Sequence, residues 1–405
     1  MAEQPKSQPY AIADLGATNA AVPIPGTPDN PLQPPVLGGV PLFYRGRAGN
    51  RARQGGLPAP VRTALAINAL YTPDPELIAA VNVALTLRLP LLLTGKPGTG
   101  KTELARNLAV SLHGTEDRLF DVAVTSGSDK ADLLYRYDEL ARLRDAYQRS
   151  EGVHDRDYLE LRGLGAAIVA AGRPGDALAP IAPGRPLPRG LATLADLLGA
   201  APEGNADARQ AFFMPAEGPP PVVLIDEIDK APRELPNDLL TELDRMRFAI
   251  PELGVRVALS DPSRWPVVII TSNAERPLSD AFLRRCVCFD VAAPEGERLR
   301  AILEAKLAAL KLLDGQAALP AELVDFVDAL RQSRDIAENE KPGTARVLDF
   351  AVLLADRGRF GGQALRALDE AVLRAALSAL LPSKAAQDAA VAIWQKWKSA
   401  PPSPR

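Results

Sequence analysis

The stretch that decides the fold is Leu91-Leu92-Leu93-Thr94-Gly95-Lys96-Pro97-Gly98-Thr99-Gly100-Lys101-Thr102. An apolar run breaks into G-x-x-x-x-G-K-T, whose glycines let the backbone curl so that successive N–H groups point at phosphate oxygens. In such a loop Lys101 reaches the β- and γ-phosphates of a nucleotide, and the hydroxyl of Thr102 binds Mg²⁺. A helix beginning at about Lys101 adds the positive end of its dipole to the same anion site. The stretch therefore predicts a strand, a phosphate-binding loop from Gly95 to Thr102, and a helix.

The composition limits the class of protein. The chain has 405 residues and a net charge of −3, and its pI is near 5.7, so it has no basic footprint for non-specific nucleic-acid binding. It contains no run approaching the ~20 apolar residues that span a bilayer, and its first residues lack the pattern of a signal peptide. We therefore expect a cytoplasmic protein without a membrane span. Its two cysteines, Cys286 and Cys288, cannot form a disulfide framework or a zinc site and are expected to be small buried side chains.

Three parts follow one another along the chain. Residues 1–60 are rich in Pro, Gly, Ala and Gln, and we expect a disordered tail because they bury too little apolar surface to offset the entropy of ordering. Residues 61–294 carry continuous apolar runs between helical patterns, which predicts an α/β domain with a parallel sheet sandwiched by helices. Residues 295–405 are helical in pattern and predict a lid domain with a C-terminal tail. The distance between the phosphate-binding loop and the next strand motif is long, and we place an insertion at about residues 150–215.

The apolar patterns predict individual elements. In the α/β domain we expect strands over residues 119–125, 221–225 and 266–270, and helices over residues 76–87, 129–148 and 235–246. In the lid we expect helices over residues 298–313, 321–334, 345–355, 364–380 and 385–397. Phe212, Phe213 and Met214 form an apolar cluster. We expect this cluster to pack against the core rather than to face a partner.

A second motif follows another apolar run, Val222-Val223-Leu224-Ile225-Asp226-Glu227. A carboxylate at the C-terminal tip of a buried parallel strand lies at the sheet edge where ligands bind. There Asp226 would hold Mg²⁺, and Glu227 would orient and deprotonate an attacking water. The alternative is an acidic helix N-terminus after a strand, but the position downstream of a phosphate-binding loop favours the catalytic interpretation.

Two weaker signals follow. Asn273 ends the stretch Ile269-Ile270-Thr271-Ser272-Asn273. At the tip of a strand its amide can bond both the attacking water and the γ-phosphate, although Ser-Asn after a strand is also ordinary turn chemistry. Arg284 and Arg285 follow a short helical segment. They are either surface charges or a means of neutralising transition-state charge in a neighbouring subunit's site.

These four elements, in this order, resemble the AAA+ ATPase family over roughly residues 61–380, and within it the MoxR group. The segments that carry the closer resemblance are Asp226-Glu227-Ile228-Asp229-Lys230-Ala231-Pro232, Thr271-Ser272-Asn273-Ala274-Glu275-Arg276-Pro277-Leu278 and Phe282-Leu283-Arg284-Arg285-Cys286. By position Asn273 matches the family's sensor 1, and Arg285 matches its arginine finger, with Arg284 as second choice. Arg346, at the start of a lid helix where sensor 2 sits, is either a γ-phosphate contact or a surface arginine.

The resemblance implies an ATP- and Mg²⁺-dependent enzyme that forms a homo-oligomeric ring, a hexamer in the family, and remodels or activates a protein partner. MoxR-like ATPases often work with von Willebrand factor A domain proteins. This chain has no Asp-x-Ser-x-Ser motif of that domain, so such a partner would be a separate chain. Two alternatives remain: a nucleic-acid motor or loader, against which the acidic pI argues, and a scaffold that binds ATP without turnover and needs neither Glu227, Asn273 nor Arg285.

Overall fold

The computed structural model describes residues 36–37, 40–41, 71, 73–148, 154–182, 184–198, 207–310, 312, 319–355 and 364–399. Of the tail expected over residues 1–60, this includes only β1 (Val36–Leu37) and β2 (Val40–Pro41), which pair antiparallel. The rest of that expectation lies outside the described residues. No helix within the described ranges is long and apolar enough to cross a bilayer.

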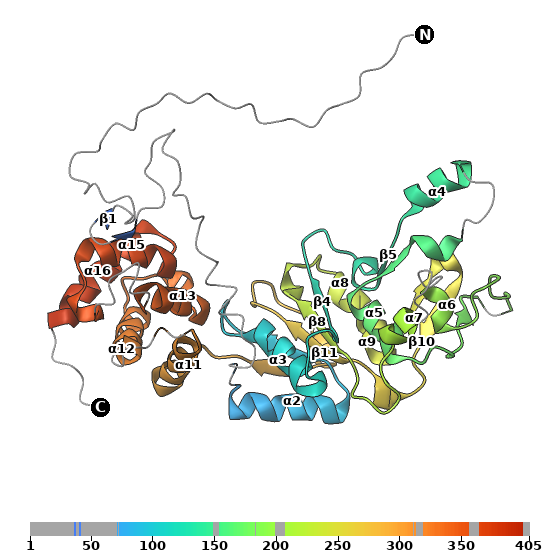
Figure 1. The fold of residues 1–405 in the computed structure, drawn as a ribbon, viewed down its shortest axis with the longest axis horizontal. Helices are drawn as coiled ribbons and strands as arrows, with labels where there is room; N and C mark the ends of the chain where they lie inside the picture. The colour runs from blue at the N-terminus through green and yellow to red at the C-terminus, as the bar shows by residue number, and fades with distance from the viewer. Residues whose placement is uncertain are drawn as a thin grey trace, which may run out of the picture.

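A five-stranded parallel sheet lies at the centre of the α/β domain (Figure 1). Its strand order is β12-β3-β11-β8-β4, with bounds β3 (Leu91–Thr94), β4 (Leu119–Ala123), β8 (Val222–Asp226), β11 (Val267–Thr271) and β12 (Val287–Asp290). The three inner strands β3, β11 and β8 are apolar along almost their whole length because helices cover both faces. Since all strands run the same way, the carboxyl ends of β3, β8 and β11 meet at one edge.

Helices cover the two faces of this sheet. They are α2 (Pro75–Leu87), α3 (Lys101–His113), α5 (Gly163–Ala171), α8 (Leu235–Asp238), α9 (Leu240–Arg245) and α10 (Asp280–Leu283). Side chains alternate between faces along a strand, so Leu91 and Leu93 share a core with Leu104 of α3, whereas Leu92 shares one with Ile168 of α5. The expected α/β class with a sandwiched parallel sheet is confirmed.

The helix expected over residues 129–148 is wrong in its first half. The segment forms a short 3₁₀ turn, η2 (Ala131–Leu133), then β5 (Tyr135–Tyr137), and only then α4 (Glu139–Gln148). β5 pairs antiparallel with β6 (Leu159–Leu161), which follows η3 (Asp155–Tyr158). Tyr135 is buried and stacks on Phe248, so a partner distant in sequence overrides the local helical spacing. Beyond this hairpin, α4 projects from the domain (Figure 1).

Residues 150–215, expected as an insertion, contain one of the helices of the sandwich itself. α5 packs against β4 and β8, so the additional chain lies on both sides of this helix rather than forming one continuous insertion. The other elements of this region and its surroundings are β7 (Ala179–Pro180), α6 (Leu194–Leu197), α7 (Asp207–Phe212), β9 (Arg247–Ile250), η5 (Pro251–Leu253), β10 (Val255–Ala258) and η6 (Pro262–Arg264). Phe213 and Met214 are buried and Phe212 is partly buried, which confirms that the cluster packs on the core.

The expectation for the cysteines is wrong for Cys288. Along β12, exposure alternates from residue to residue, and Val287 and Phe289 occupy the face that packs on the core. Cys288 points the other way and is exposed, while Cys286 lies just before the strand and is half-buried. Burial raises the pKa of the Cys286 thiol to about 12.

Gly165 is a point of close contact that a side chain would disrupt. A Cβ there would lie 2.0 Å from the carbonyl oxygen of Leu134, and backbone cannot move aside as a flexible side chain does. We expect Gly165→Ala to destabilise the domain by at least about 2 kcal/mol, which lowers the midpoint of thermal unfolding by ~4–8 °C. Gly175→Ala is the control, because no atom lies within 4 Å of its added Cβ. Equal midpoints for the two variants would contradict this packing.

The C-terminal part is helical and has its own core. It comprises α11 (Gly296–Ala309), α12 (Leu319–Gln332), η7 (Glu338–Glu340), α13 (Thr344–Ala355), η8 (Leu365–Ala367), α15 (Glu370–Leu380) and α16 (Lys384–Ser399). Phe326, Phe350 and Leu373 are fully buried in it, and the indole N–H of Trp394 donates to the Leu365 carbonyl at 3.1 Å. We refer to this part, beginning with α11, as the lid.

Candidate functional site

The loop between β3 and α3 contains three glycines with positive φ angles. Gly95, Gly98 and Gly100 have φ values of +135°, +78° and +93°, a region that residues with a Cβ rarely adopt. A Cβ at Gly95 would also lie 2.5 Å from the carbonyl oxygen of Val291. The turn that aims backbone N–H groups toward a phosphate therefore depends on these glycines.

Lys101, the first residue of α3, is 7% exposed. Its ammonium donates to the carbonyl oxygens of Gly95 at 2.6 Å and Lys96 at 2.9 Å, and to Oδ1 of Asn273 at 2.9 Å. Burial lowers the pKa of Lys101, and the nearby carboxylates, Asp229 first among them, oppose that shift. The structure thus places the charged end of Lys101 between the loop and the tip of β11.

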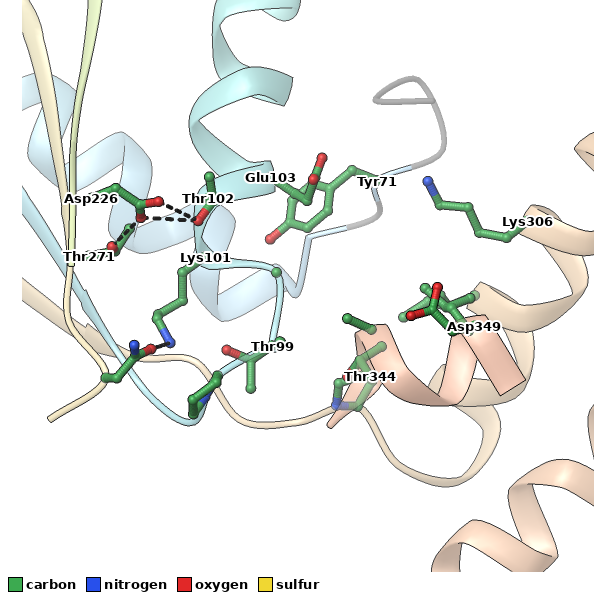
Figure 2. Close-up of a pocket in the computed structure, with 18 of the residues that line it drawn as sticks. Tyr71, Thr99, Lys101, Thr102, Glu103, Asp226, Thr271, Lys306, Thr344 and Asp349 are labelled. Atoms are coloured by element: carbon green, nitrogen blue, oxygen red, sulfur yellow. Dashed lines mark hydrogen bonds between the residues drawn. The ribbon is translucent and has the colours of Figure 1, made fainter. Parts of the chain in front are cut away.

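Thr102 and Asp226 meet at the end of β8. The Thr102 hydroxyl donates to Oδ1 of Asp226 at 3.1 Å, and the Thr271 hydroxyl donates to the same oxygen at 2.5 Å (Figure 2). A threonine hydroxyl and a carboxylate beside a phosphate-binding loop are the protein ligands that fit Mg²⁺ together with nucleotide phosphates. The structure therefore brings together Thr102 and Asp226, the two side chains expected from the sequence to bind the metal. Thr271 was not singled out, because a threonine in a strand carries no signal of its own.

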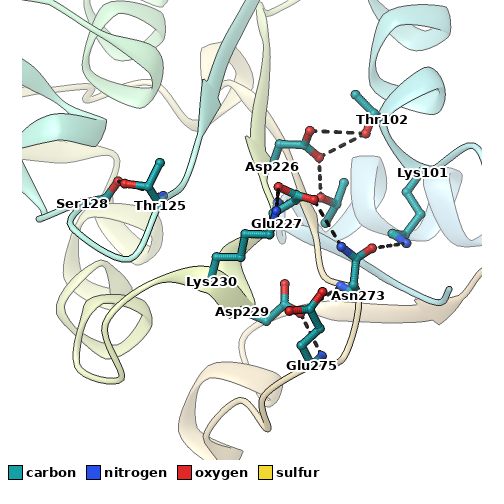
Figure 3. Close-up of polar contacts among 11 residues, drawn as sticks. Lys101, Thr102, Thr125, Ser128, Asp226, Glu227, Asp229, Lys230, Asn273 and Glu275 are labelled. Atoms are coloured by element: carbon teal, nitrogen blue, oxygen red, sulfur yellow. Dashed lines mark hydrogen bonds and ion pairs between the residues drawn. The ribbon is translucent and has the colours of Figure 1, made fainter. Parts of the chain in front are cut away.

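Glu227 and Asn273 lie side by side at the same edge (Figure 3). Nδ2 of Asn273 donates to Oε1 of Glu227 at 3.2 Å, so Asn273 joins Lys101 to Glu227. Lys230 donates to the other carboxylate oxygen of Glu227 at 2.5 Å. The backbone of Glu227 has φ +59°, and its N–H donates to the Thr271 hydroxyl at 2.9 Å. Both carboxylate oxygens of Glu227 thus accept a hydrogen bond, one from Lys230 and one from Asn273.

A cavity of about 470 Å³ extends from the loop to the lid. Lys101, Thr102 and Asp226 lie at one end of it, and Tyr71, Lys306 and Asp349 lie toward the lid (Figure 2). The other lining residues include Glu227, Asn273, Pro294, Arg298, Ile302 and Leu348. Apolar, cationic and acidic groups therefore line the side toward the lid. Burial raises the pKa of Tyr71 to about 12, so its phenol is neutral at physiological pH. No sequence motif marks these residues, because packing against the lid is what brings them together.

The lid touches the phosphate-binding loop directly. Glu338 pairs with Lys96 of the loop, and with Lys341 of the lid at 2.7 Å. These two lysines lower the pKa of Glu338 to about 2, so its carboxylate stays charged through the neutral range. A Cβ at Gly343 would lie 2.7 Å from the carbonyl oxygen of Pro97. The loop is therefore in contact with both domains.

The three expected arginines lie outside this cavity. Arg346 on α13 is exposed, and its neighbours Thr344 and Ala345 line the cavity where Arg346 does not. Arg284 and Arg285 at the end of α10 are also exposed. Arg285 donates from Nε to Asp244 of α9 at 2.8 Å and from Nη1 to the Ala281 carbonyl at 3.0 Å. None of the three completes the site of its own chain.

Part of the chain matches a known protein family. Residues 90–157 match the family model described as AAA domain (dynein-related subfamily), a range that includes β3, the phosphate-binding loop, α3 and β4. The chain has the AAA+ fold. A search of curated proteins found no match. Among solved structures, the chain is similar to one named "S. cerevisiae Hsp104-ADP complex", with 18% identity and a TM-score of 0.35. The match covers 69% of this chain and 44% of that one.

Proposed function

We propose that this chain binds ATP with Mg²⁺ in the cavity between the sheet and the lid, and hydrolyses it. The observation that carries the proposal is the hydrogen-bonded series Lys101–Asn273–Glu227 beside the pair Thr102–Asp226. A cation for phosphate, an amide, a carboxylate base and a metal-binding carboxylate are the groups that nucleotide hydrolysis uses. A scaffold that only holds nucleotide would not need Glu227 beside Asn273.

Each side chain has a role in the proposed reaction. Lys101 leaves its carbonyl partners to contact the β- and γ-phosphates, and Thr102 and Asp226 hold Mg²⁺, which when bound neutralises charge on the phosphate oxygens. Glu227 accepts the proton of the attacking water. Lys230 and Asn273 each donate to one oxygen of Glu227, and the remaining lone pairs of the carboxylate can accept the hydrogen bond of the water.

The binding half of the proposal is tested at Lys101. Lys101→Ala removes charge-assisted hydrogen bonds to phosphate, and we expect the dissociation constant for MgATP to rise by about ten- to a hundredfold. Titration calorimetry with MgATP measures this value. Lys384→Ala, an exposed lysine at the start of α16, is the control and keeps wild-type affinity. Unchanged affinity in Lys101→Ala would show that the phosphates lie elsewhere.

We further propose that the chain works as a MoxR-like ring in the cytoplasm and remodels or activates a protein partner, such as a von Willebrand factor A domain protein on a separate chain. The position of Arg285 supports assembly, because it is exposed at the end of α10 and outside the cavity of its own chain. We infer that Arg285 completes the site of a neighbouring subunit. A hexamer is the ring expected by resemblance to this group.

A further inference from the structure

Asp229 is a buried carboxylate next to the proposed catalytic residues. It follows Glu227 by two residues, lies on η4 (Ile228–Lys230), and is 3% exposed. Its Oδ2 accepts the backbone N–H of Asn273 at 3.1 Å and that of Glu275 at 2.9 Å (Figure 3). A buried carboxylate is stable only where hydrogen bonds or charges compensate it, and here the compensation comes from the loop after β11.

That loop has a conformation that depends on side-chain partners. Ala274, between the two N–H donors, has φ +59°, a conformation that residues with a Cβ rarely adopt. A left-handed residue between two others turns their N–H groups toward one anion, and Asp229 is that anion. The N–H of Ala274 in turn donates to the Ser272 hydroxyl at 3.0 Å. The backbone at Asn273 is thus held by Asp229, which lies just after β8.

The position of this backbone determines which residues the side chain of Asn273 can contact. Its Oδ1 accepts from Lys101 and its Nδ2 donates to Glu227, so its amide spans two residues of the proposed site. If the loop relaxed, both contacts would lengthen together, because they depend on one Cα position.

We propose that Asp229 is a positioning residue that holds Asn273 in place for the hydrolysis step through its two backbone hydrogen bonds. The proposal rests on the ATPase function proposed above. It is distinct from binding, since Asp229 does not line the cavity. We expect a loss of Asp229 to lower turnover by more than it lowers nucleotide affinity.

Two conservative variants separate the hydrogen bonds from the charge. Asp229→Asn keeps an oxygen that can accept both N–H groups and removes the charge, and its amide nitrogen takes the place of Oδ1, which has no hydrogen-bond partner among the described residues. Asp229→Glu keeps the charge and moves the acceptor by one methylene. We expect Asp229→Asn to retain most of the wild-type kcat and Asp229→Glu to lose about tenfold or more.

The experiment measures kcat for ATP and the dissociation constant for MgATP on the full chain. Asp229→Ala is expected to lower kcat by about ten- to a hundredfold with affinity within about twofold of wild type, whereas the control Asp261→Ala leaves both unchanged. Asp261 also accepts a backbone N–H and a hydroxyl, from Ser263, but outside the site. If Asp229→Ala does not fold, the Asn and Glu variants decide alone.

Three results would overturn the role of Asp229. They are a wild-type kcat in Asp229→Glu, equal loss in Asp229→Asn and Asp229→Glu, and a fall in affinity as large as the fall in kcat. A wild-type chain that binds but does not hydrolyse ATP would instead overturn the proposed function, and the role of Asp229 in hydrolysis with it.

Discussion

Replacing Arg285 by alanine is expected to lower the steady-state ATPase rate by about 10³–10⁵-fold, because an arginine delivered to the transferring phosphoryl group contributes that much in other nucleotide hydrolases. In this chain Arg285 is paired with Asp244 at 2.8 Å, and both side chains are about two-fifths exposed. An ion pair so exposed to solvent contributes little, so a neighbouring site can draw the arginine away. Arg284→Ala is the matched control and is expected to have a much smaller effect.

A mixing experiment distinguishes action in a neighbouring subunit from action within one chain. Subunits carrying Arg285→Ala are mixed with subunits carrying Glu227→Gln, each inactive alone. Where a subunit with intact Glu227 adjoins one with intact Arg285, the site is complete and activity partly returns. The account is wrong if mixed rings form and stay inactive, or if the chain hydrolyses ATP as a monomer.

Glu227→Gln is expected to lower kcat by about 10²–10⁴-fold, the contribution of a positioned general base. The amide keeps the shape of the side chain but cannot accept the proton of the attacking water. ATP affinity should stay near wild type, and the isolated variant should carry ATP rather than ADP. Phosphate release and chromatography of the extracted nucleotide measure the two quantities.

The control for this prediction is Glu234→Gln. Glu234 is an exposed glutamate just before α8, and its substitution leaves turnover at the wild-type rate. Near wild-type turnover in Glu227→Gln would assign the base to another residue.

Local sequence determined much of the fold and the inner part of the site. The phosphate-binding loop could be predicted because its glycine spacing acts within a few residues. Asp226 and Glu227 could be predicted because four apolar residues before them define a buried strand. The meeting of Asn273 with Glu227 then follows from the parallel sheet, in which β8 and β11 are neighbours.

Residues whose role depends on tertiary contacts were not predicted. Asp229 acts through the N–H groups of a loop some forty residues later in the chain, and no spacing rule connects the two. Lys230 donates a hydrogen bond to Glu227, and Thr271 donates one to Asp226. These contacts were not predicted either, because they too depend on the tertiary fold. The prediction of a helix from residue 129 was wrong in its first half for a similar reason, because β5 forms by pairing with β6.

Phosphate release from ATP by the purified full chain with Mg²⁺ tests the central claim most directly, with Lys101→Ala prepared in the same way to measure any contaminating hydrolase. The account predicts release that saturates with ATP in the wild-type chain and is lost in Lys101→Ala. Equal rates of release from the two preparations would contradict it.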